Sequence, residues 1–113
     1  MAETAALPVD EPWALRLFRK SVLKQRKLAE LTESLGPTDG LRCLDLGSDN
    51  GVVSLLLRRA GGTWASADLT DEAVTSIRAL VETDVHRIDA GALPFPDAAF
   101  DRVAVVDMLE HAP

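Results

Sequence analysis

The 113-residue sequence is poor in cysteine and has no long apolar run. Its one cysteine, Cys43, cannot form an internal disulfide and lies among apolar residues, which indicates a small core residue in a reducing compartment. No run approaches the roughly 18 apolar residues of a membrane span, and residues 1–10 lack the basic start and apolar stretch of a signal peptide. We therefore expect a cytoplasmic chain without a membrane span.

Lysine is absent beyond Lys27, and the net charge is −6. The acidic main body argues against nucleic acid as its chief partner. The run from Arg16 to Lys27 is the exception, because it carries only basic charges. It is either a solvated helix face or a surface for an anionic partner such as RNA, phospholipid or a phosphorylated carrier. Phe18 is the one aromatic residue within that run, so stacking on bases is poorly supported.

The apolar pattern changes its period along the chain. Residues 1–10 indicate a loose tail, and leucines spaced by three and four predict a helix over 11–35 within a helical segment 11–37. From residue 38 onward, short apolar runs alternate with helical patterns, which predicts a parallel α/β sheet. Strands are expected over 41–46, 64–68, 85–89 and 100–106, with helices over 51–60 and after Thr70.

Each predicted strand ends in or just before an aspartate: Asp45, Asp68, Asp89 and Asp107. One such aspartate alone is as readily explained as a turn former or a helix cap. In an open α/β sheet, however, ligands bind beyond the carboxyl ends of the strands. The four carboxylates together therefore predict one common site at this edge.

The turn after the first strand reads LDLGSDNG over residues 44–51. A glycine-bearing turn into a helix N-terminus presents free backbone N–H groups to a ligand. The dinucleotide pattern G-x-G-x-x-G fails here, because Asp49 and Val52 occupy two of its glycine positions. A pyrophosphate would also be repelled by Asp45 and Asp49. The turn therefore suits a ligand without phosphate and with positive charge, such as S-adenosylmethionine.

This turn resembles the first motif of class I S-adenosylmethionine-dependent methyltransferases, an acidic residue followed by G-x-G-x-G. Gly47 and Gly51 match the outer glycines, and Asp49 replaces the middle one. The stretch LPFPDAAFDRVAVVDMLEH over 93–111 resembles the fourth-strand motif of the branch that includes the ubiquinone and menaquinone biosynthesis methyltransferases. The resemblance covers residues 41–111. It implies a partial Rossmann-like methyltransferase fold, with strand order 3-2-1-4 and an N-terminal helix.

The resemblance also implies S-adenosyl-L-methionine as the cofactor. Asp68 would accept hydrogen bonds from the ribose hydroxyls, Asp89 would lie beside the adenine, and Asp45 would hold the turn and the ammonium group. No metal site is expected, because the Cys and His residues share no ligand spacing. His111 is a candidate general base, with a helix-start or surface role as the alternative. The expected cofactor-binding residues are Asp45, Gly47, Ser48, Asp49, Gly51, Asp68, Leu69, Asp89, Ala90 and Asp107.

A complete methyltransferase of this class has further strands after the fourth, so residues 38–113 are expected to form a truncated half-domain that is inactive alone. The fourth strand would then be an open apolar edge, suited to self-association or to a second polypeptide. The expected function is the cofactor-binding portion of a methyltransferase whose acceptor is a small molecule or a carrier-bound group. The alternative is a non-catalytic binding or assembly module, in which Asp49 has abolished cofactor binding.

Overall fold

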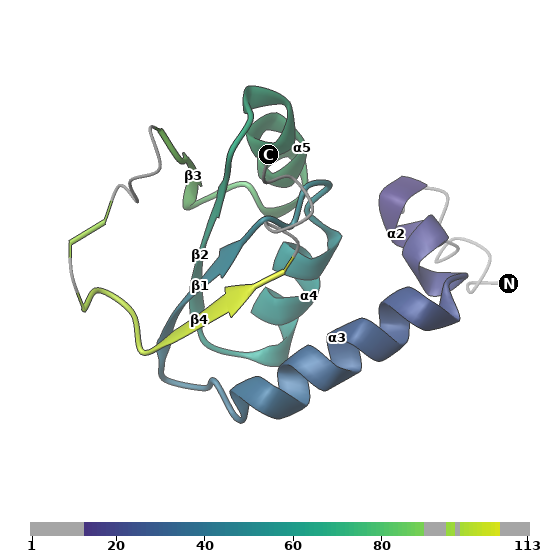
Figure 1. The fold of residues 1–113 in the computed structure, drawn as a ribbon, viewed down its shortest axis with the longest axis horizontal. Coiled ribbons are helices and arrows are strands. Elements are labelled where there is room, and N and C mark those ends of the chain that lie inside the picture. Colours follow the sequence, from purple (N-terminus) through teal and green to yellow (C-terminus); the bar gives the residue numbers. More distant parts are fainter. Residues whose placement is uncertain (1–12, 90–94, 97, 107–113) are drawn as a thin grey trace, which may run out of the picture.

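The computed structural model describes residues 13–89, 95–96 and 98–106. Strands and helices alternate from β1 to β3, and two helices precede them (Figure 1). This order confirms the α/β class expected from the sequence. The elements are α2 (Trp13–Arg19), α3 (Val22–Leu35), β1 (Arg42–Leu46), α4 (Val52–Ala60), β2 (Thr63–Asp68), α5 (Asp71–Val81), β3 (Val85–Arg87) and β4 (Arg102–Val105).

The four strands form one sheet in the order β3-β2-β1-β4, and all three pairings are parallel. In this register Leu44 of β1 lies between Ala65 of β2 and Val103 of β4. The expected strand order 3-2-1-4 is confirmed. Because the strands are parallel, their carboxyl ends share one edge of the sheet, where the first turn also lies.

The two faces of the sheet are covered differently. Alternate residues of a strand point to opposite faces, so Cys43 and Leu44 belong to different clusters. Cys43 packs with Trp64 and with leucines of α3 and α4. Leu44 belongs to a second cluster, against which Phe95 and Phe100 pack. The described helices α3, α4 and α5 therefore cover one face, and Phe95 and Phe100 pack against the other.

The N-terminal helical segment is divided. Instead of the single helix expected over 11–35, α2 ends at Arg19 and α3 begins at Val22. Ser21 adopts an extended conformation, and its hydroxyl accepts a hydrogen bond from the Lys24 N–H at 3.1 Å. The Gln25 side chain donates to the Arg19 carbonyl at 2.7 Å. These bonds satisfy backbone groups that two helix ends would otherwise leave free, so the chain turns a corner here.

The helix α5 begins where the sequence indicates. The Thr70 hydroxyl accepts a hydrogen bond from the Ala73 N–H at 3.1 Å, and two acidic residues occupy the first turn. Such residues favour a helix N-terminus because they satisfy free N–H groups and interact well with the helix dipole. Within the described part of the chain, no helix combines the length and apolarity needed to cross a bilayer.

Candidate cofactor-binding site

The turn between β1 and α4 has a left-handed backbone at three of its residues. Gly47 has φ 83°, Asp49 φ 63° and Gly51 φ 88°. Glycine adopts such values without steric penalty, and aspartate is one of the few other residues that does so often. Asp49 therefore stands in the place of the motif's middle glycine in a conformation that also suits glycine.

Gly51 is required by packing as well as by conformation. A Cβ at this position would lie 2.9 Å from the Ile77 Cα and 3.3 Å from Leu80 Cδ1. The start of α4 thus approaches the backbone of α5 as closely as only glycine allows. The next backbone N–H, that of Val52, donates to the Asn50 side chain at 3.0 Å. Gly51 therefore fixes where α4 begins relative to α5.

Asp45 is fully buried beneath this turn. Its carboxylate accepts hydrogen bonds from the hydroxyls of Ser54 and Ser66, each at 2.6 Å, and lies 3.6 Å from an Arg58 nitrogen. Burial raises the pKa of Asp45, while the two serine hydrogen bonds and the Arg58 charge oppose that rise. The group ties β1 to α4 and β2. A direct contact between Asp45 and a ligand stays a prediction.

Arg58 completes this buried network. Its guanidinium donates to the Ser66 hydroxyl at 2.7 Å and to the carbonyls of Trp64 and Thr83, each at 3.2 Å. The sequence motifs did not point to Arg58, Ser54 or Ser66 as members of the site. The signal in the sequence that could have indicated them is a serine within an otherwise apolar pattern. Ser54 interrupts the buried face of α4, and Ser66 interrupts the buried run of β2.

Asp68 joins the end of β2 to the turn between β1 and α4. Its side chain is almost fully buried, and one carboxylate oxygen accepts from the Asp49 N–H at 2.9 Å. The other oxygen accepts from the Leu69 N–H at 2.7 Å. Each carboxylate oxygen has two acceptor sites, so Asp68 retains capacity for ligand hydroxyls. The structure thus brings together three residues predicted for the cofactor: Asp49, Asp68 and Leu69.

Ser48 contains an unsatisfied polar atom at this site. The residue is 7% exposed, and its Oγ is buried without a hydrogen-bond partner in the part of the chain that the structure describes. Leaving a buried hydroxyl unpaired costs roughly 1–3 kcal/mol, so native structures rarely retain one without a reason. A polar ligand at the turn would supply the missing partner, and the site therefore fits a cofactor with hydrogen-bonding groups.

The other predicted residues are less closely tied to the turn. The Ile88 N–H donates to the Asp68 carbonyl at 2.8 Å, which places the chain after β3 beside the end of β2. Asp89 follows with an exposed side chain, 3.9 Å from an Arg87 nitrogen. Ala90, Asp107 and His111 lie outside the described residues.

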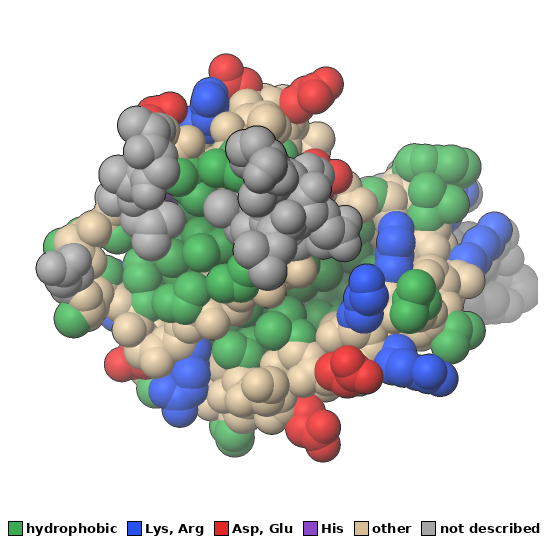
Figure 2. Space-filling model, in the orientation of Figure 1, with side chains coloured by type: hydrophobic (Ala, Val, Ile, Leu, Met, Phe, Trp, Pro, Cys, Tyr) green, Lys and Arg blue, Asp and Glu red, His purple; other side chains and the backbone are tan. Residues whose placement is uncertain are grey.

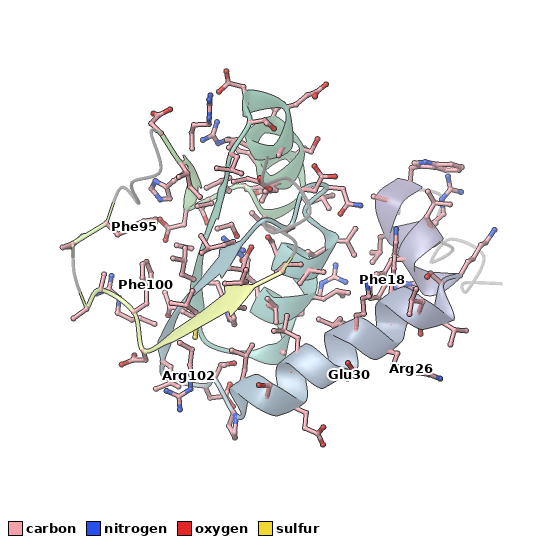
Figure 3. All side chains as sticks on the ribbon, viewed as in Figure 1. Phe18, Arg26, Glu30, Phe95, Phe100 and Arg102 are labelled. Atoms are coloured by element: carbon pink, nitrogen blue, oxygen red, sulfur yellow. The ribbon has the colours of Figure 1, made fainter. Side chains whose placement is uncertain are left out.

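A cavity of about 620 Å³ adjoins the turn between β1 and α4. It is lined by Ser48, Asp49 and Asn50 of the turn, and by residues of α2, α3, the start of α4 and the end of β4. Phe18, which packs against Val52, lies between the α2–α3 corner and α4 (Figure 3). The described residues hold no group of three or more His, Cys, Asp or Glu side chains that could bind a metal.

Comparison with known sequences gives the family. A family described as a methyltransferase domain matches residues 44–113, which include the turn and all four strands from Leu44 of β1 onward. The chain belongs to this methyltransferase family. Together with the glycine-bearing turn and the strand order, the match identifies a class I S-adenosylmethionine-dependent methyltransferase fold, as the sequence motifs indicate.

Several curated methyltransferases are similar to the chain. It is 34% identical over 87 residues to a ubiquinone biosynthesis O-methyltransferase of Ralstonia nicotianae, covering 72% of this chain and 37% of the relative. It is 38% identical over 92 residues to a malonyl-[acyl-carrier protein] O-methyltransferase of Erwinia pyrifoliae, covering 79% and 35%. A protein-L-isoaspartate O-methyltransferase of Anaeromyxobacter dehalogenans is 33% identical over 103 residues, covering 85% and 49%. The chain thus spans about a third to a half of these relatives.

Solved structures agree on the fold. A proposed methyltransferase from Bacillus halodurans superposes with a TM-score of 0.61 at 24% identity, covering 69% of this chain and 36% of that one. A chain from the complex between the Haloferax volcanii Trm112 methyltransferase activator and a proposed methyltransferase gives a TM-score of 0.55 at 28% identity, covering 72% and 36%. The partial Rossmann-like methyltransferase fold is therefore confirmed.

Proposed function

We propose that this chain binds S-adenosyl-L-methionine and forms the cofactor-binding portion of a methyltransferase that acts on a small-molecule or carrier-bound acceptor. The observation that carries the proposal is the locked turn, in which Asp68 holds the Asp49 backbone and the Ser48 hydroxyl has no described partner. The family match supports the cofactor. All three relatives named above are O-methyltransferases, which supports an oxygen atom as the methyl acceptor.

The proposed roles follow from the chemistry of each group. Asp68 accepts hydrogen bonds from the ribose hydroxyls through its free acceptor sites, and Ser48 bonds a polar group of the amino-acid moiety. Asp49 is exposed at the turn and attracts the ligand's positive charge. Asp89, which lies after β3, would be placed beside the adenine. When bound, the cofactor supplies an electrophilic methyl group, so the protein's main contribution is to position the acceptor in line with it.

Calorimetric titration of the purified chain tests the cofactor directly. We expect binding of S-adenosylmethionine and of its demethylated product, with no measurable binding of NAD, because a pyrophosphate would face Asp49. NAD binding tighter than that of S-adenosylmethionine would reject the proposal. The alternative of a non-catalytic module is not favoured, because the matched family and the named relatives are methyltransferases.

The open edge of β4 supports a proposed partner. Within the described strands β4 pairs with β1 alone, and Val103 and Val105 are 50% and 53% exposed. An edge strand with an apolar face is a template for further pairing. We expect either self-association or binding of a second polypeptide here, and no methyl transfer by the isolated chain. Sedimentation across a concentration series, with a parallel transfer assay, checks both; a compact monomer with turnover would contradict them.

A further inference from the structure

The cavity beside the turn extends well beyond the residues proposed to bind the cofactor. It is lined by Ser48 and Asp49, but not by Asp68, Leu69 or Asp89. A cofactor that runs from the turn along the ends of β2 and β3 would therefore contact the cavity through the turn. Most of the lining residues belong instead to α2, α3 and the end of β4, so a second molecule could contact them.

Most of this second region is apolar. Phe18 comes from α2, Leu28 and Leu31 from α3, and two valines each from α4 and from the end of β4. Apolar walls of this kind stabilise an apolar ligand body by removing its surface from water, while a few polar groups fix its orientation. The lining therefore favours an acceptor with an aliphatic or aromatic body.

Two cations stand among these apolar residues. Lys24 and Lys27 are three positions apart on α3, so they share one face of the helix, and both line the cavity. Neither forms a salt bridge among the described residues. Glu30 is the one carboxylate that α3 contributes to the lining, and Asp49 lies across the cavity at the turn. The cavity is thus cationic on the helix wall and anionic at the turn.

We infer that this cavity binds the methyl acceptor and selects one that joins an anionic group, a carboxylate or a phosphate, to an apolar body, with Lys24 and Lys27 holding the anion. This inference rests on the proposed function. The polarity would suit both ligands at once, because Asp49 would attract the positive charge of the cofactor and the two lysines would attract the negative charge of the acceptor. Both lysines are exposed, so they discriminate between acceptors without contributing to the folded core.

A matched pair of probes tests the inference on the full chain. 4-Propylbenzoate and 4-propylbenzamide share one apolar body and differ in charge. Titrations followed by ¹H–¹⁵N NMR, with and without S-adenosylhomocysteine, should show the benzoate binding about fivefold to tenfold more tightly, as expected for a charge-assisted contact. The double variant Lys24→Gln/Lys27→Gln should reduce this preference to less than about twofold. The benzamide should still perturb the resonances of Ser48 and Leu28 in this variant, which would show that the cavity is intact.

The matched control is Lys20→Gln/Arg26→Gln, which removes the same net charge from positions outside the cavity lining. Figure 3 shows Arg26 pointing away from the body of the molecule. This control should keep the wild-type preference. Equal loss of preference in both double variants, or no preference in the wild-type chain, would overturn the inference.

The same titrations separate the acceptor from the cofactor. If Lys24→Gln/Lys27→Gln weakens S-adenosylhomocysteine binding and leaves the probe preference intact, the lysines hold the cofactor's carboxylate and the inference is wrong. If the chain binds no S-adenosylhomocysteine but keeps a lysine-dependent preference for the benzoate, the proposed cofactor role fails while the anion-selective cavity stands. If the chain binds S-adenosylhomocysteine but shows no preference for the benzoate, the proposed cofactor role stands and the inference about the cavity is wrong.

Discussion

The two sides of the molecule that meet at the first turn are built differently. On the β1–β2 side, polar groups are buried and hydrogen-bonded to one another, as with Asp45 and Asp68. On the side of α2, α3 and β4, apolar side chains are exposed, including Trp13 at 67% and Val22 at 72%. Figure 2 shows Lys and Arg side chains gathered over the α2–α3 part. One side of the site is therefore closed and hydrogen-bonded, and the other is exposed to solvent.

This contrast implies that substitutions on the two sides have different consequences. On the closed side a lost partner leaves a buried polar group unsatisfied, so the free energy of unfolding should fall. On the open side the changed groups are already in water, so binding should change with little effect on stability.

The largest effect is expected for Asp45→Ala. The substitution leaves the hydroxyls of Ser54 and Ser66 without their acceptor and removes the carboxylate that lies 3.6 Å from the partly buried Arg58 guanidinium. Breaking such a buried pair costs about 3–5 kcal/mol. Urea denaturation followed by circular dichroism measures the loss. The control Asp71→Ala removes the carboxylate of an exposed pair with Arg87 and should cost no more than about 1 kcal/mol. Equal losses in the two variants would contradict the contrast between the sides.

Gly51→Ala should follow, with a loss of about 2–4 kcal/mol from backbone strain and overpacking. The added methyl would lie 2.9 Å from a backbone atom, the Ile77 Cα, which cannot move without shifting α5. Gly40→Ala is the matched control, because Gly40 has φ 77° but a methyl group added there would have nothing within 4 Å. It should lose only the conformational part, about 1–2 kcal/mol. Similar thermal denaturation of both variants would show that the close approach to α5 contributes little.

A smaller effect concerns the pH dependence of stability. Burial raises the folded-state pKa of Asp45 above its ordinary value of 3.8. The folded state therefore binds a proton at this carboxylate more tightly than the unfolded state does. The stability contributed by this difference is fully present below the unfolded pKa and is lost as the pH rises through the folded pKa. Asp45→Asn should remove that decline. The free energy of unfolding in urea is measured for the wild-type chain and for Asp45→Asn at a series of pH values from about pH 3 upward, and the difference between the two curves isolates the contribution of Asp45. Parallel curves would contradict the prediction.

The sequence predicted the parts of the fold that rest on local rules. Short apolar runs located the strands, Thr70 located the start of α5, and the motif resemblance supplied the order of the strands. The corner at Ser21 was not predicted, because residues 13–35 contain neither glycine nor proline. The corner is marked instead by the side-chain hydrogen bonds of Ser21 and Gln25.

For the candidate site, the sequence gives the residue types and their positions along the chain, but not the orientation of their side chains. That Asp68 ends β2 could be read from the sequence, whereas its bond to the Asp49 backbone depends on how the end of β2 meets the turn after β1. The inward direction of Asp45 depends on Arg58, Ser54 and Ser66, which converge only in the folded chain. Tertiary contacts of this kind leave no local periodic signal.

The smallest effect separates two serines that lie on either side of the boundary between the closed and open parts. Ser54 donates to Asp45, so Ser54→Ala should destabilise the chain by about 1–3 kcal/mol. Ser48 has a buried hydroxyl without a described partner, so Ser48→Ala should stabilise the ligand-free chain by about 1 kcal/mol. If that hydroxyl serves the cofactor, the same substitution should weaken S-adenosylhomocysteine binding by roughly threefold to tenfold, the value of one lost hydrogen bond. Thermal denaturation with and without this ligand measures both quantities on one sample. Stabilisation in the ligand-free chain together with a smaller ligand-induced shift would show that Ser48 is held for binding and not for folding, whereas a loss of stability equal to that of Ser54→Ala would place Ser48 within the closed, structural part of the molecule.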